Sequence, residues 1–154
     1  MDLHRYRFRS VWPLAAAPEE VFRALRDVDD YPEWWPQVRR VDRIDDGTYD
    51  MVVRSVLPYD LVFRSTRSRE DEAAGVLEAR MAGDLDGLSR WTIREDGAGT
   101  TLVFEEQVVA VKTMLRRLAF VARPAFVANH VLMMRAGRRG LRAYLAGRRR
   151  GDRT

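Results

Sequence analysis

The sequence predicts an α+β fold in which a curved, seven-stranded antiparallel sheet is covered by one long C-terminal helix. Seven segments alternate apolar and polar residues with a period near two, which is typical of strands with one buried face. Short turn motifs such as Asp45-Asp46-Gly47 separate them and favour hairpin connections. From Pro124 to Leu145 the apolar residues recur at spacings of three and four, which indicates a helix.

The first elements along the chain are one strand and two short helices. The strand is expected over residues 4–12, and alternate residues form its buried face, namely Tyr6, Phe8, Ser10 and Trp12. A helix follows from Ala17-Pro18, because proline suits the first helical turn and two glutamates lie at the positive end of the helix dipole. A turn and a second short helix over residues 29–36 end at Pro36.

Six further strands are expected over residues 38–45, 48–56, 59–70, 76–84, 87–95 and 100–111. Because hairpins join sequential neighbours, these strands form a meander. A helical segment over residues 114–122 comes next, Pro124 interrupts it, and a longer helix runs over residues 124–145. Its 22 residues span about 33 Å at about 1.5 Å each, which is enough to cover one face of the sheet.

The long helix carries its apolar stripe on residues that include Phe126, His130, Met133, Leu141 and Tyr144. Two glycines, Gly137 and Gly140, lie in the same helix although each costs up to about 1 kcal/mol relative to alanine. Two interpretations remain open. The glycines allow the helix to approach the sheet closely, or they are tolerated without a structural role.

Composition excludes several classes of site. The chain has 154 residues, no cysteine and only two histidines, His4 and His130, far apart in the sequence. Disulfides, thiol chemistry and cysteine- or histidine-rich metal sites are therefore excluded. The sequence also lacks a glycine-rich phosphate loop and a serine-nucleophile elbow. We expect no metal and no cofactor.

Targeting signals are also missing from the sequence. No run of about 18 apolar residues is present, as a membrane-spanning helix would need. The N-terminus alternates charged and apolar residues and does not resemble a signal peptide. We expect a cytoplasmic protein.

Four sequence motifs indicate a family. They are Ala-Pro-Glu-Glu-Val-Phe at residues 17–22, Asp-Tyr-Pro-Glu-Trp-Trp-Pro at 30–36, Gly-Asp-Leu-Asp-Gly at 83–87, and Gly-Thr-Thr-Leu-Val-Phe at 99–104. In this order they resemble the START-related superfamily of polyketide cyclase/dehydrase and lipid-transport-like proteins, which includes the birch-pollen-allergen fold. The resemblance covers about residues 4–146.

This resemblance implies a helix-grip fold, in which the sheet wraps around the C-terminal helix and encloses an apolar cavity. It also implies binding of lipids, sterols, polyketides or hormones, and in some members the cyclisation or dehydration of polyketide chains. Residues 1–147 would then form one ligand-binding domain, and residues 148–154 a disordered basic tail.

A cavity in such a fold would be lined by the inward strand faces and the apolar helix stripe. Alternation along each strand then selects aromatic and methionine side chains, which suit an apolar ring or acyl ligand. The predicted ligand-binding residues are Trp35, Tyr49, Met51, Tyr59, Phe63, Met81, Ser89, Trp91, Phe104, Phe126 and Met133.

The tryptophans that follow Tyr31-Pro32 have two interpretations. In the first, one ring of Trp34 and Trp35 closes the cavity mouth or the open end of the sheet, and the other ring is exposed. In the second, both rings fill the core.

Two titratable residues fall on inward faces and are candidates for catalysis. Glu106 shares a strand face with Phe104, and a buried carboxylate is costly unless it is paired. A bulge that turns Glu106 outward, or a position at the cavity mouth, would remove that cost. His130 lies on the helix stripe and either exchanges protons with a ligand or bonds a strand carbonyl. The two can form an acid–base pair only if strand and helix meet there.

Charge is distributed unevenly along the chain. Residues 1–111 contain 15 arginines and 22 acidic residues, a balance of −7, whereas residues 112–154 contain 12 basic residues and one acid, a balance of +11. The basic end is a solvated helix face with a frayed tail, or it meets an anionic membrane or an acidic partner. Nucleic acid is disfavoured because no stacking aromatics are interleaved with the arginines.

Three functions are therefore compatible with the sequence. The first is binding, with or without transport, of a hydrophobic, lipid-like or polyketide-like molecule. The second is a polyketide cyclase/dehydratase in which His130 and Glu106 transfer protons, with Tyr49, Tyr59 or Ser89 orienting the substrate. The third is an interaction module that docks on an anionic membrane or acidic protein through the arginine-rich helix.

Overall fold

The computed structural model describes residues 5–55, 60–111 and 119–153, with side chains described from Arg123 onward in the last range. Its elements are β1 (Arg5–Leu14), α1 (Pro18–Arg26), the 3-10 turn η1 (Val28–Asp30), α2 (Tyr31–Trp34), β2 (Val38–Asp45), β3 (Thr48–Arg54), β4 (Asp60–Asp71), β5 (Val76–Gly83), β6 (Leu85–Asp96), β7 (Gly99–Ala110) and α4 (Ala119–Gly151). This order confirms the predicted fold class.

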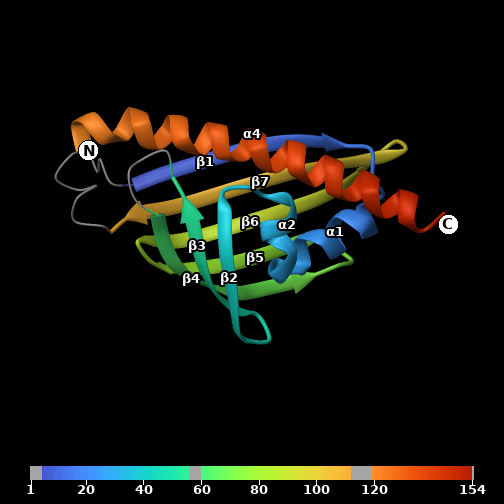
Figure 1. The fold of residues 1–154 in the computed structure, drawn as a ribbon, viewed down its shortest axis with the longest axis horizontal. Helices are drawn as coiled ribbons and strands as arrows, with labels where there is room; N and C mark the ends of the chain where they lie inside the picture. The colour runs from blue at the N-terminus through green and yellow to red at the C-terminus, as the bar shows by residue number, and fades with distance from the viewer. Residues whose placement is uncertain (1–4, 56–59, 112–118, 154) are drawn as a thin grey trace.

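All seven strands belong to one antiparallel sheet, in the order β1-β7-β6-β5-β4-β3-β2. The meander from β2 to β7 is as predicted. β1 joins the free edge of β7, and ten residue pairs from Arg5↔Val109 to Leu14↔Thr100 set its register. Figure 1 shows α4 running along the length of the sheet, with α1 and α2 beside its C-terminal half.

Strand alternation determines which side chains face α4. The burial pattern of β3, for example, alternates between buried Tyr49, Met51 and Val53 and their less buried neighbours. The inward faces of the strands, the apolar face of α1 and the inner face of α4 form one hydrophobic core. Leu25, Leu102 and Leu141 are among its fully buried members.

The C-terminal helix differs from the prediction at its start. Pro124 does not interrupt α4 but lies inside it. Proline removes one backbone hydrogen bond while its fixed φ remains helical, and packing of the helical residues that follow, such as buried Phe126, offsets that loss. Of the helix expected over residues 114–122, only the part from Ala119 lies in the described residues.

The helix also extends further than predicted. It continues to Gly151, so Arg148, Arg149 and Arg150 lie in helix and not in a disordered tail. Arg149 donates to the Ala15 carbonyl at 2.7 Å and to Glu20 Oε2 at 3.2 Å, and these bonds fasten the last turn to the start of α1.

Candidate functional site

A pocket of about 140 Å³ lies between the inward face of the sheet, the α1–α2 segment and α4. Its wall is mostly apolar, because the strands that form it present aromatic, leucine, valine and methionine side chains inward. The volume exceeds what a single water molecule needs several-fold. An apolar wall interrupted by a few polar groups is the usual composition of a small-molecule site.

The structure brings nearly all of the predicted ligand-binding residues into this one wall. Those that line the pocket are Trp35, Tyr49, Met51, Phe63, Met81, Ser89, Trp91, Phe104, Phe126 and Met133. Tyr59 lies outside the described residues. Period-two alternation in five strands and the three-to-four spacing in the helix therefore converge on the same space.

Glu106 and His130 meet inside the pocket. His130 Nε2 lies 3.0 Å from Glu106 Oε2, and the two side chains are only 11% and 10% exposed. No bulge turns Glu106 outward, since its register with both neighbouring strands is continuous through Phe8↔Glu106 and Ser89↔Glu106. The contact gives the buried carboxylate a hydrogen-bond partner, which lowers the cost of its burial.

The His130 ring is held by stacking as well as by hydrogen bonding. It lies parallel to the Phe8 ring, with centroids 3.6 Å apart and planes at 6°, and Phe104 stacks less closely at 6.2 Å. β1, β7 and α4 thus fix the imidazole in one orientation. A fixed imidazole beside a carboxylate, both lining an apolar pocket, can give or accept a proton on a bound ligand.

Trp34 and Trp35 are both buried, at 3% and 5% exposure, so the expectation that one ring is exposed is wrong. Trp35 lines the pocket, and its Nε1–H donates to the Met133 carbonyl at 2.9 Å. The two indole rings stack with centroids 5.3 Å apart. The pair packs tightly because α4 carries glycines where it crosses them.

Gly137 and Gly140 are both required by this crossing. A Cβ added to Gly140 would lie 1.5 Å from the Trp34 carbonyl oxygen, and one added to Gly137 would lie 2.7 Å from the Trp35 ring. The close approach is therefore made chiefly to the end of α2, and not to the sheet alone. This settles the interpretation of the glycines in favour of packing.

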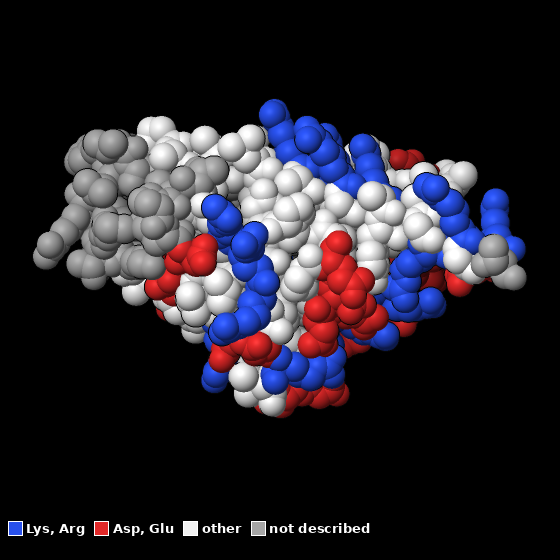
Figure 2. Space-filling view, viewed as in Figure 1, with Lys and Arg blue, Asp and Glu red and all other residues white. Residues whose placement is uncertain are grey.

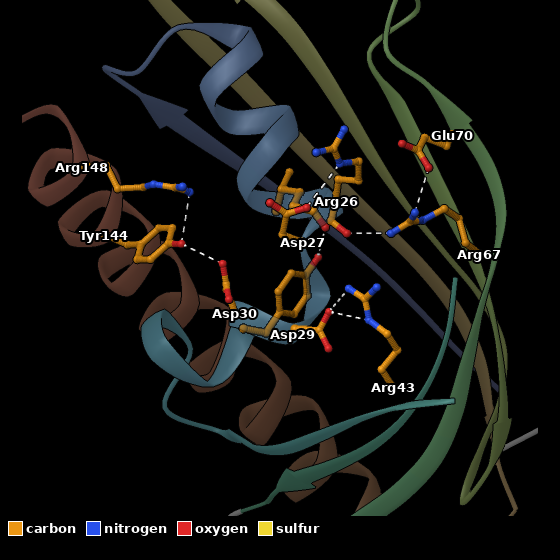
Figure 3. A network of polar contacts seen from close by, with 11 residues as sticks. Arg26, Asp27, Asp29, Asp30, Arg43, Arg67, Glu70, Tyr144 and Arg148 are labelled. Carbon is orange, nitrogen blue, oxygen red and sulfur yellow. Dashed lines mark hydrogen bonds and ion pairs between the residues drawn. The ribbon is translucent and has the colours of Figure 1, made fainter. Parts of the chain in front are cut away.

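A polar network anchors the segment that forms one side of the pocket (Figure 3). Arg67 of β4 donates to the Arg26 carbonyl at 2.6 Å and to Glu70 at 2.8 Å. Arg43 of β2 binds Asp29 through two guanidinium nitrogens. These bonds tie η1 and the end of α1 to two strands.

The same network reaches the C-terminal helix (Figure 3). Tyr144 donates to Asp30 at 3.2 Å, and Arg148 donates to the Tyr144 hydroxyl at 3.2 Å. The α1–α2 segment is thereby fastened on both sides, to the sheet and to α4.

Tyr31 lines the pocket directly after Asp30 of this network. Its hydroxyl donates to the Leu25 carbonyl at 2.7 Å, and burial is the main reason why its pKa is raised well above the usual 10.0. Tyr31 therefore stays neutral inside the core and acts as a hydrogen-bond donor.

Sequence reasoning missed several lining residues, among them Leu25, Tyr31, Arg67 and Asn129. A signal existed for two of them. Arg67 continues the inward alternation of Phe63 along β4, and Asn129 lies three residues after Phe126 and four before Met133 on the helix stripe. Leu25 and Tyr31 line the pocket only because the α1–α2 segment folds over the sheet, which periodicity does not show.

Among the described residues, no group of three or more carboxylate and imidazole side chains is placed to hold a metal ion. Within the same ranges, no helix has an apolar stretch long enough to cross a bilayer.

Comparison with known families decides where the chain belongs. The family model described as polyketide cyclase / dehydrase and lipid transport matches residues 5–146. The chain belongs to this family. The predicted resemblance is confirmed, and family and fold together support hydrophobic ligand binding or polyketide cyclase activity in general terms. No curated protein matches the chain.

Solved structures share the fold at low sequence identity. The Zhui aromatase/cyclase from Streptomyces sp. R1128 superposes with a TM-score of 0.80 at 19% identity, covering 94% of this chain and 96% of that one. A START superfamily protein from Mycobacterium smegmatis gives 0.66 at 17% identity, with 92% and 97% covered.

A di-domain protein is also similar. The aromatase/cyclase StfQ of the steffimycin biosynthetic pathway gives a TM-score of 0.74 at 16% identity, over 95% of this chain and 52% of that one. This chain therefore corresponds to about half of that protein. At these identities all three likenesses show the fold alone.

Proposed function

We propose that this protein binds one hydrophobic small molecule, lipid-like or polyketide-like, in the pocket between the sheet and α4. The observation that carries the proposal is the apolar composition of the pocket wall. Aromatic and methionine side chains from five strands and two helical regions surround a pocket of about 140 Å³. Burial of an apolar ligand against these side chains supplies the affinity, at about 25 cal/mol per Å² of apolar surface.

A pocket-filling substitution tests this proposal. Ser89 lines the pocket and lies opposite Ala79 in the neighbouring strand. Ser89→Phe should place a ring in the ligand space and reduce affinity at least tenfold. The matched control is Leu88→Phe, one residue away on the outer face, where Leu88 is 45% exposed.

The measurement has two parts. Native mass spectrometry of the protein purified from its own host looks for a bound apolar molecule. Titration with a panel of fatty acids, sterols and aromatic polyketides then follows the fluorescence of the pocket tryptophans Trp35 and Trp91. Equal affinity in Ser89→Phe and Leu88→Phe, with both variants folded, would place the ligand elsewhere.

A second function is favoured by one specific observation, the 3.0 Å contact between His130 and Glu106 in the pocket. We propose as an alternative that this pair cyclises or dehydrates a poly-β-ketone chain. One partner takes a proton from the carbon between two carbonyls, and the enolate so formed attacks a ketone carbon of the same chain. This attack closes the ring, and the new alkoxide takes up the proton. The resulting hydroxyl then leaves as water together with a proton from the neighbouring carbon, which forms a carbon–carbon double bond. No oxidant, reductant or cofactor is needed.

Glu106→Gln separates this alternative from simple binding. Glutamine keeps the shape and a hydrogen bond to His130 but cannot accept a proton as a carboxylate does. Turnover of a poly-β-ketone thioester should fall about 100-fold or more, as expected for loss of a general acid or base, while ligand affinity changes less than threefold. Unchanged turnover in both Glu106→Gln and His130→Gln would leave the pair with a packing role.

A further inference from the structure

The outward face of α4 is divided along its length into an apolar half and a basic half. The apolar half consists of exposed Pro124, Val127, Ala128, Val131 and Leu132. The three larger side chains, Val127, Val131 and Leu132, are 38%, 42% and 50% exposed. Large apolar side chains gathered on one solvent-facing helix surface mark an interaction site.

The basic half follows directly. Arg135, Arg138, Arg139 and Arg142 occupy the next two turns, Arg148–Arg150 lie near the helix end, and α4 contains no acidic residue. Within the ranges that the structure describes, the Arg135 and Arg139 side chains make no hydrogen bond or ion pair. In Figure 2 the edge of the molecule occupied by α4 is white over its earlier turns and blue further along.

We propose that this face of α4 binds the surface of an anionic lipid bilayer. A bilayer offers a matching region for each half of this face. Its acyl boundary suits Val127, Val131 and Leu132, and its anionic headgroups suit the arginines. An acidic protein would neutralise the arginines but provides no reason for the apolar turns beside them. A second copy of this chain would bring two rows of arginine into the same contact region.

The helix would lie in the plane of the interface and not across it. The opposite side of the same turns carries Phe126, Asn129, His130 and Met133, which line the pocket. One helix diameter, about 10 Å, would then separate the pocket wall from the lipid. The docking proposal is independent of what the pocket holds, since it depends only on the outward face.

Vesicle co-sedimentation tests the proposal with the full chain. We expect binding to vesicles of phosphatidylcholine with 30% phosphatidylserine, little binding to phosphatidylcholine alone, and weakening between 50 and 500 mM salt. Arg135→Gln with Arg139→Gln should reduce affinity about 30-fold, the effect of removing two arginines from an anionic surface. Val131→Gln with Leu132→Gln should also weaken binding, and this loss should persist in high salt.

Two controls make the outcome decisive. Arg80→Gln with Arg94→Gln removes the same charge from exposed positions on the sheet and should leave vesicle binding unchanged. Thermal unfolding verifies that each variant is folded. Absence of binding to the anionic vesicles at 50 mM salt would overturn the proposal, as would equal loss in the sheet control. A concentration-dependent dimer that Val131→Gln with Leu132→Gln dissociates would assign the face to a second copy instead.

Discussion

At the scale of single residues, the polar pair in the pocket shows where sequence reasoning stops. Alternation places Glu106 on the inward face of β7, and helical spacing places His130 on the inner stripe of α4. Neither period determines how far along the sheet the helix lies. The 3.0 Å contact depends on tertiary packing of α4 against Phe8 and the tryptophans, which a linear pattern does not contain.

Tyr31 allows a prediction about the contribution of a single buried hydroxyl to stability. Tyr31→Phe removes the hydroxyl that donates to the Leu25 carbonyl and should lower the free energy of unfolding by about 1 kcal/mol at pH 7. Because burial raises the folded-state pKa above 10.0, the tyrosine contribution is complete below pH 10 and is lost as pH rises above it. Urea unfolding at pH 9 and pH 11 should therefore show a smaller alkaline loss in Tyr31→Phe than in the unmodified protein. An equal loss in both would mean that Tyr31 ionises normally.

At the scale of elements, α4 is determined by close packing more than by helix propensity. Gly137 and Gly140 are poor helix formers, yet each occupies a place where a side chain would collide with the tryptophan pair. The sequence showed that the glycines were unusual, but the identity of the neighbouring element came from the fold. The continuation of the helix through Pro124 and to Gly151 was missed for the same reason, since local signals alone indicated a break and a frayed end.

Two alanine substitutions in α4 should act in opposite directions. Gly140→Ala should lower stability by about 1 to 3 kcal/mol, because the new methyl group meets the Trp34 carbonyl and forces the helix away. Gly147→Ala has no atom within 4 Å of the new methyl group and should raise stability by about 0.5 to 1 kcal/mol through helix propensity. Thermal unfolding of both variants measures the difference, and a stabilising Gly140→Ala would show that α4 tolerates a wider spacing.

At the scale of the whole molecule, the period-two pattern was sufficient to predict both the sheet and most of the pocket wall. β3, β4 and β6 each alternate between inward and outward residues over much of their length, so Met51, Phe63 and Trp91 could be assigned without coordinates. The partner of β1 and the volume left beneath α4 could not be predicted. Both arise from sheet curvature and from the fit between distant elements, which depend on the packing of all the side chains at once.

The pairing of β1 with β7 has a consequence for how the chain matures during synthesis. Among the described strands, β1 pairs only with β7, which comes about 90 residues later. It therefore has no hydrogen-bonding neighbour while the intervening meander leaves the ribosome. Such sequence-distant pairing slows folding. Until β7 and then α4 have been translated, the hydrophobic inner face of the sheet stays uncovered. The nascent chain is therefore most prone to aggregation during that interval.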